Sequence, residues 1–151
     1  MTDVVIRPAT EADVPTIVGM LAEDEIGATR ESPDDLAPYL RAFADIVADS
    51  NQVLVVADRG GEVVGTLQLT IIPGMSRKGA KRALVEGVRV GAAARGLGLG
   101  TILMEWSINE AKRRECHLIQ LTSDKTRVDA HRFYDRLGFV GSHEGFKLLL
   151  R

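Results

Sequence analysis

The sequence predicts one α/β domain over residues 1–151, with a mixed, largely antiparallel central sheet flanked by helices. Two observations lead to this class. Short apolar runs typical of strands are interspersed with stretches in which apolar residues recur at helical spacing. The chain also has no repeat, linker or low-complexity segment that would divide it. The predicted order of elements is β-α-α-β-β-β-α-β-α-β-β.

The N-terminal part is expected to form a strand and two helices. Residues 4–8 make a short strand, and Thr10 and Asp13 have the spacing of a capping box, so a helix should follow. The periodicity lapses over residues 23–31. A second helix is expected from Ser32, because this cap residue precedes a proline and two acids. The predicted buried residues are Val14, Ile17, Val18 and Leu21 in the first helix, and Leu36, Leu40, Phe43 and Val47 in the second.

The middle of the chain should supply three strands and a long helix. The expected strands cover residues 52–57, 62–72 and 83–90. Gly60 and Gly61 indicate a tight hairpin between the first two, and a basic loop precedes the third. The helix over residues 101–114 has two apolar sides, which suggests that it packs between the sheet and a second surface. These sides are Leu99, Ile102, Leu103 and Trp106, and Met104, Ile108 and Ala111.

The C-terminal part is expected to contain one more strand, a helix and a closing hairpin. The strand covers residues 118–121, and the helix over residues 127–137 ends at Gly138, a residue typical of helix C-termini. Short closing strands are expected at residues 139–140 and 146–150.

The composition excludes several classes of protein. A net charge of −2 gives no general attraction to nucleic acid, and no apolar run approaches the length of a membrane span. The three histidines have no metal-ligand spacing, so no metal site is expected. Cys116 is the only cysteine and cannot form an internal disulfide, which favours a cytoplasmic location.

The segment Arg95–Gly100 has the composition of a phosphate-binding loop. It follows an expected strand and precedes an expected helix, and alternate glycines let a ligand approach the main chain. The spacing differs from the Gly-x-Gly-x-x-Gly of dinucleotide folds, and Gly100-Thr101 lacks the lysine of a P-loop. Taken alone, the segment could also be a flexible turn.

Two motifs together resemble the GCN5-related N-acetyltransferase (GNAT) superfamily. Arg95, Gly98 and Gly100 fit its Arg/Gln-x-x-Gly-x-Gly/Ala loop, and residues 130–139 fit its Ala-x-x-Phe-Tyr-x-x-Leu-Gly-Phe segment. The element order is similar over nearly the whole chain. The resemblance implies a GNAT-like sheet and acetyl-CoA as cosubstrate, with no metal. The cofactor-binding residues that it implies are Val88, Arg89, Val90, Arg95, Gly96, Leu97, Gly98, Leu99, Gly100 and Thr101.

The resemblance also implies two catalytic residues. Tyr134 matches the tyrosine that often protonates the departing thiolate, and the alternative is aromatic packing beside Phe133. Glu86 matches a glutamate used as a base in some members. It interrupts an apolar strand, so burial is expected, and burial would raise its pKa. Where many members have asparagine, this chain has Arg127, which could reach a CoA phosphate, bind an anionic substrate or be solvated.

The acceptor is expected to be a primary amine of a small molecule, with the acetyl group transferred directly. Acids between the first two helices (Glu23, Asp24, Glu25 and Glu31) could steer a cationic amine, whereas the basic loop over residues 77–82 could draw an anionic acceptor. A lysine or α-amine of a protein and a non-catalytic acetyl-CoA sensor are the alternatives. No nucleic-acid or membrane partner is expected. A homodimer is suggested by the second apolar side of the long helix, which could equally cover the sheet.

Overall fold

The computed structural model describes residues 3–150, which form two compact units, residues 3–120 and residues 121–150. The sheet has the strand order β1-β2-β3-β4-β5. Its strands are β1 (Val4–Pro8), β2 (Gln52–Arg59), β3 (Glu62–Ile72), β4 (Arg82–Val90) and β5 (Leu118–Leu121). Strands β1 to β4 pair antiparallel, and the helical crossover from β4 to its neighbour β5 is the connection typical of a parallel pair. The predicted mixed, largely antiparallel α/β sheet is therefore confirmed, while a single domain over the whole chain stays a prediction.

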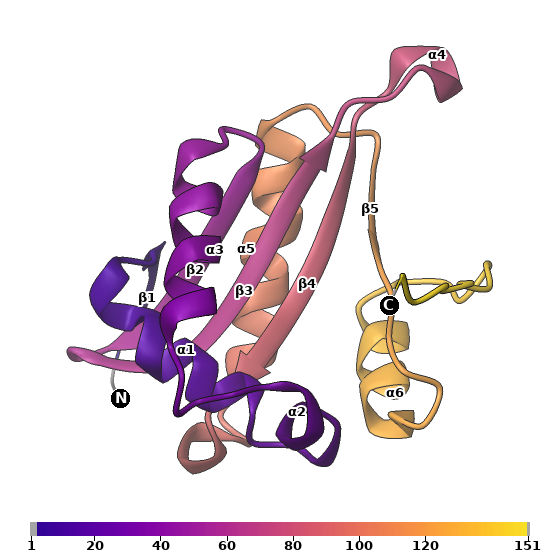
Figure 1. Cartoon of the computed structure of the whole chain (residues 1–151). Coiled ribbons are helices and arrows are strands. Elements are labelled where there is room, and N and C mark those ends of the chain that lie inside the picture. Colours follow the sequence, from indigo (N-terminus) through magenta and orange to yellow (C-terminus); the bar gives the residue numbers. More distant parts are fainter. Residues whose placement is uncertain (1–2, 151) are drawn as a thin grey trace. The chain divides into compact units, whose positions relative to one another are not determined.

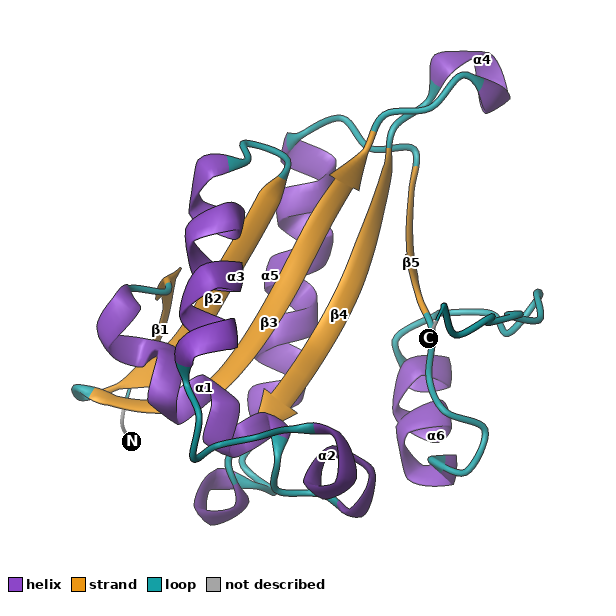
Figure 2. Cartoon of the chain, viewed as in Figure 1, coloured by secondary structure: helices purple, strands orange, loops and turns teal. Residues whose placement is uncertain are grey.

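Helices cover both faces of the sheet (Figures 1 and 2). The helices α1 (Val14–Leu21) and α3 (Ala37–Ala48) lie on one face, and α5 (Leu99–Arg113) lies on the other. The alternation of side chains along β3 explains this arrangement, because Leu67, Leu69 and Ile71 all point to the α5 face and are buried. On the opposite face Val56 packs with residues of α1. The core thus lies in two layers, one on each side of the central strands.

Local signals at the start of the chain are confirmed. The carboxylate of Asp13 accepts hydrogen bonds from the backbone N–H of Thr10 (2.7 Å) and from its hydroxyl (3.1 Å). It is also bonded by Arg7, which contacts Asp58 of β2 as well. These bonds fix β1, the 3-10 turn η1 (Glu11–Asp13) and α1 at one corner of the sheet.

The second long helix differs from the prediction. It begins at Ala37 rather than near Ser32, with the backbone N–H of Ala37 bonded to the side chain of Asp35 (3.2 Å). Its half-buried residues are Leu36, Tyr39, Phe43 and Ile46, whereas Leu40 and Val47 of the predicted face are exposed. Residues 36, 39, 43 and 46 follow the helical spacing of three and four, so the face that packs is rotated by about one residue from the predicted face. A short helix, α2 (Glu25–Arg30), occupies the segment where periodicity lapses.

The hairpin prediction is confirmed, and the basic loop contains a short helix. Gly60 and Gly61 both have positive φ (61° and 92°) at the turn between β2 and β3. The helix α4 (Ser76–Gly79) contains Arg77 and Lys78 with φ of 55° and 62°, in the left-handed region.

The expected dimer face on α5 is covered within the chain. Met104 and Ala111 of the second apolar side are buried together with Leu103, since α5 packs against β3 and β4. This side therefore gives no support to a homodimer, which stays a prediction.

The second unit contains α6 (Val128–Arg136), followed by Gly138 with the positive φ (96°) expected after a helix. The closing strands predicted at residues 139–140 and 146–150 are wrong for the described chain, which has no strand there. Phe146 and Leu150 are 92% and 91% exposed, and an extended segment becomes a strand only when its backbone groups pair with a neighbour. The apolar pattern of these residues does not reveal whether such a neighbouring strand is present.

Candidate active site

The glycine loop between β4 and α5 has the geometry of an anion seat. Gly96 and Gly98 have φ of 83° and 77°, and a Cβ added at either would meet no atom within 4 Å, so a ligand can reach the backbone there. Gly98 is the N-cap of α5. The following N–H groups, those of Leu99, Gly100 and Thr101, therefore have no acceptor one helical turn back. These donors and the helix dipole favour a phosphate at this position.

Arg95 is held beside this loop by a carboxylate from the end of α1. Its guanidinium lies 3.2 Å from Glu23 and donates to the carbonyl of Val90 (3.3 Å). The same Glu23 oxygen accepts from the backbone N–H of Ala92 (3.0 Å). Sequence reasoning considered Glu23 as an attractor for a cationic amine, but in the structure this carboxylate already has a cationic partner.

The neighbouring acid makes a similar link to β4. One Arg89 nitrogen lies 3.7 Å from the carboxylate of Asp24, and another donates to the carbonyl of Val88 (2.9 Å). Two consecutive acids therefore connect the segment after α1 to β4 and to the glycine loop. Since Asp24 is also paired, the predicted attraction of an amine to this acidic segment is weakened.

A β-bulge interrupts the pairing of β3 with β4 next to Val88–Val90, which are predicted to bind the cosubstrate. Thr66 faces Arg89 and Gln68 faces Glu86, so two residues of β4, Gly87 and Val88, stand opposite one residue of β3. Gly87 has φ of 62°, the conformation in which glycine is favoured at such bulges. The bulge leaves main-chain groups of β4 outside the β3–β4 ladder. The sequence contained its signal, a glycine inside a strand pattern, but sequence reasoning missed it.

Glu86 lies on β4 immediately before the bulge. The expectation that it is buried is wrong, because this residue is exposed. Its neighbours Ala83 and Val85 are buried on the α5 face, whereas Glu86 points to the opposite face at the side of β4. Since the carboxylate is exposed, its proposed role as a base depends on its position alone.

Tyr134 and Arg127 belong to the second unit. The ring of Tyr134 packs against Phe133 (centroids 5.3 Å apart) and Phe139 (5.9 Å), so the packing alternative holds at least in part. Arg127 is the N-cap of α6 and lines a hollow of about 370 Å³ formed by residues 126–130. His131 contacts the carbonyl of Asp124 (2.9 Å).

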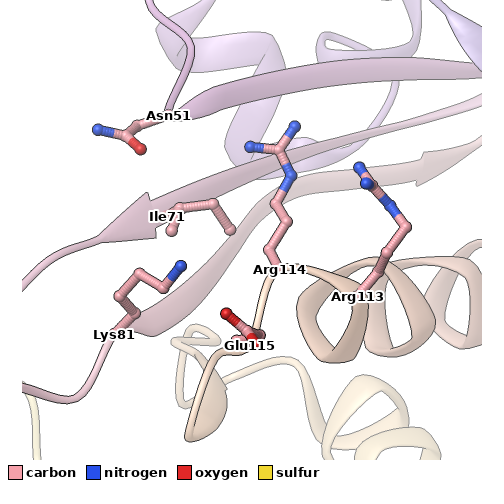
Figure 3. Close-up of a pocket in the computed structure, with 6 residues that line it drawn as sticks. All are labelled: Asn51, Ile71, Lys81, Arg113, Arg114 and Glu115. Atoms are coloured by element: carbon pink, nitrogen blue, oxygen red, sulfur yellow. The ribbon is translucent and has the colours of Figure 1, made fainter.

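A second hollow, of about 350 Å³, lies at the far end of α5 (Figure 3). Lys81, Arg113 and Arg114 line it, but both arginines bond to Glu110, which offsets much of their charge. The 15 residues of α5 separate this hollow from the glycine loop by about 20 Å. It is therefore a different place from the predicted cofactor site. Burial raises the pKa of the neighbouring Cys116 thiol, which fits an inert residue.

Residues 3–150 contain neither a cluster suited to a metal ion nor a helix suited to span a membrane. Within this range no cluster of three histidine, cysteine or acidic side chains is arranged to hold a metal ion. Nor does any helix in the described part of the chain have the length and apolar character needed to cross a bilayer.

Comparison with known proteins identifies the family. The model of the acetyltransferase (GNAT) family matches residues 18–139. An aminoalkylphosphonate N-acetyltransferase from Salmonella typhimurium is 30% identical over 141 residues, which cover 93% of this chain and 88% of that protein. A glucosamine 6-phosphate N-acetyltransferase from Trypanosoma brucei brucei is 28% identical over 98% of this chain and 99% of its own length.

A solved structure agrees closely with the fold. The crystal structure of a protein described as a transcriptional regulator from Bacillus halodurans C-125 has 50% sequence identity and a TM-score of 0.94, covering 98% of this chain and all of that one. The family match spans most of the chain, and the two enzymes named above are both N-acetyltransferases. The chain therefore belongs to the acetyltransferase (GNAT) family and is an N-acetyltransferase.

Proposed function

We propose that this protein transfers the acetyl group of acetyl-CoA directly to a primary amine of a small molecule. The observation that carries the proposal is the glycine loop, whose left-handed Gly96 and Gly98 open the N-terminus of α5 to an anion. In this proposal the loop residues Arg95–Thr101 bind the pyrophosphate of the cosubstrate. The pantetheine arm bonds to the main chain of Val88–Val90, where the bulge leaves groups outside the ladder.

The reaction needs one proton acceptor and one proton donor. The amine nitrogen forms a bond to the thioester carbon, and the carbon–sulfur bond breaks. We assign Glu86 to accept the proton that the amine loses, directly or through water, and Tyr134 to give a proton to the departing thiolate. The exposure of Glu86 supports a role in which an incoming amine can reach it. Arg127 is proposed to contact an anionic group of the cosubstrate or of the acceptor.

The relatives support a small acceptor. The two enzymes named above act on an aminoalkylphosphonate and on glucosamine 6-phosphate, which are both amines that carry an acidic phosphorus group. Such compounds therefore belong in the first panel of acceptors, together with uncharged and polycationic amines. The cytoplasmic location remains a prediction based on the single cysteine.

The experiment that tests the proposal has two stages. Calorimetric titration with acetyl-CoA and desulfo-CoA at two salt concentrations should give micromolar, salt-sensitive binding, because phosphate recognition is electrostatic. Thiol release is then followed with the amine panel. If folded protein binds neither ligand, the proposed role of the glycine loop is wrong. If it binds acetyl-CoA tightly but neither small amines nor peptides cause thiol release, the sensor alternative is favoured.

A further inference from the structure

A row of polar side chains lies on the α1/α3 face of the sheet. This polar row consists of Gln52 on β2, Gln68 and Thr70 on β3, and Glu86 on β4. The strand register places its members side by side: Gln52 is opposite Thr70, and Gln68 is opposite Glu86. Polar groups of three neighbouring strands therefore lie close together on one face of the sheet.

The uncharged members of the row are bonded to one another. The side-chain amides of Gln52 and Gln68 are joined at 2.9 Å, and the Thr70 hydroxyl donates to the Gln52 amide at the same distance. The Gln52 oxygen accepts both bonds, and neither bond uses the Gln52 NH₂ group or the Gln68 oxygen. The network fixes the three side chains while it leaves hydrogen-bonding capacity for a ligand.

Burial falls steadily toward this part of the sheet face. Val56 and Thr66, on the same face, are buried, and Val56 lies in a cluster with residues of α1. Gln52, Gln68 and Thr70 are half-buried, and Glu86 is exposed. Figure 1 agrees, since α1 and α3 lie over β2 and β3, with the Arg82 end of β4 beyond them. The polar row therefore stands where helix coverage of the first unit ends.

We propose that the polar row is an acceptor subsite that binds hydroxyl groups of a sugar-like or polyhydroxylated amine. This inference rests on the proposed function, because it places the amine at Glu86 and the hydroxyl groups along Gln68, Thr70 and Gln52. Neighbouring positions are about 5 Å apart across the strands and about 7 Å apart along β3, which suits several polar groups on a short rigid frame. The row contains no cation, so it selects hydroxyl groups rather than a phosphate.

The test separates binding from turnover. Glucosamine is compared with cyclohexylamine, a ring amine without hydroxyl groups, by saturation-transfer NMR in the presence of desulfo-CoA and by thiol release with acetyl-CoA. The variants are Gln68→Met and Thr70→Val, which keep side-chain size while removing the polar atoms. Asn109→Leu on the exposed side of α5 and Thr16→Val on α1 are the matched controls, since both residues are exposed and lie outside the row.

The expected result is that wild type binds glucosamine and prefers it to cyclohexylamine. Each row variant should lower kcat/KM for glucosamine about tenfold, the effect of losing one or two hydrogen bonds, and leave the cyclohexylamine rate and desulfo-CoA affinity unchanged. The controls should behave as wild type. No detectable binding of glucosamine, or equal losses for both amines, would overturn the subsite. Binding of glucosamine without thiol release would instead overturn the proposed transfer while leaving the subsite supported.

Discussion

Two glycines of the first unit should respond to alanine in opposite directions. Gly98 is the N-cap of α5 with φ of 77°, whereas Gly19 lies inside α1, and a Cβ added at either position would meet no atom within 4 Å. Because neither substitution causes a clash, the backbone conformation alone decides whether the free energy of unfolding rises or falls. A left-handed conformation costs a non-glycine residue about 1–2 kcal/mol, so Gly98→Ala should destabilise by that amount. Gly19→Ala should stabilise by about 0.5–1 kcal/mol, because alanine is the better helix former.

Urea denaturation followed by the fluorescence of Trp106 measures both effects, since this residue on α5 is the only tryptophan in the sequence. In thermal unfolding, the Tm should change by about 2–4 °C for each kcal/mol. Gly98→Asn provides a further control and should lose less stability than Gly98→Ala, because asparagine tolerates the left-handed region better. If Gly98→Ala unfolds at the same urea concentration as wild type or at a higher one, the left-handed N-cap is wrong. The geometric argument for phosphate binding at the glycine loop would then fail.

Further predictions concern single side chains. Arg7 lowers the pKa of the Asp13 carboxyl, so the folded state gains stability from this pair above about pH 4 and loses it as the pH falls further. Asp13→Asn should lower the urea midpoint at neutral pH, and the midpoint of this variant should decrease less than that of wild type between about pH 5 and pH 3. Glu86→Gln should lower kcat by about 10²-fold, while calorimetry shows unchanged acetyl-CoA affinity. Tyr134→Phe should lower kcat to a similar extent with unchanged affinity, and wild-type kcat in that variant would leave the tyrosine a packing residue. Because burial raises the pKa of Cys116, iodoacetamide should modify it more slowly at pH 7 than it modifies glutathione, and equal rates would contradict the assigned burial effect.

Features with short-range causes could be predicted from the sequence. The hairpin at Gly60-Gly61 follows from a dipeptide that accepts positive φ, and the C-terminal end of α6 follows from Gly138. The glycine loop can be located for the same reason, because the glycines that adopt positive φ are visible in the sequence. In each case the residues that cause the conformation are the residues that adopt it.

Features that depend on distant partners could not be predicted. Glu23 and Arg95 lie 72 positions apart, and nothing near either residue indicates that they pair. The exposure of Glu86 depends on where α1 and α3 end over the sheet, which an apolar strand pattern does not reveal. The start of α3 differs from the prediction because Ser32 and Asp35 are both plausible cap residues, and the helix uses a bond to Asp35. Whether residues 139–140 and 146–150 form strands likewise depends on a pairing partner and not on local preference.

The bulge in β4 also limits how this enzyme can be altered. Thr66 and Gln68 are two positions apart and share a sheet face, so their partners Arg89 and Glu86 share it too, although they are three positions apart. Only the extra residue reconciles that odd spacing with two-residue alternation. Deleting Gly87 would give Glu86 and Arg89 the ordinary two-residue spacing, so both would keep their face, but the bulge and the main-chain groups that it leaves outside the ladder would be lost. An engineer can therefore exchange side chains along β4, but shortening the strand at Gly87 would remove the main-chain groups that we propose for binding the cosubstrate.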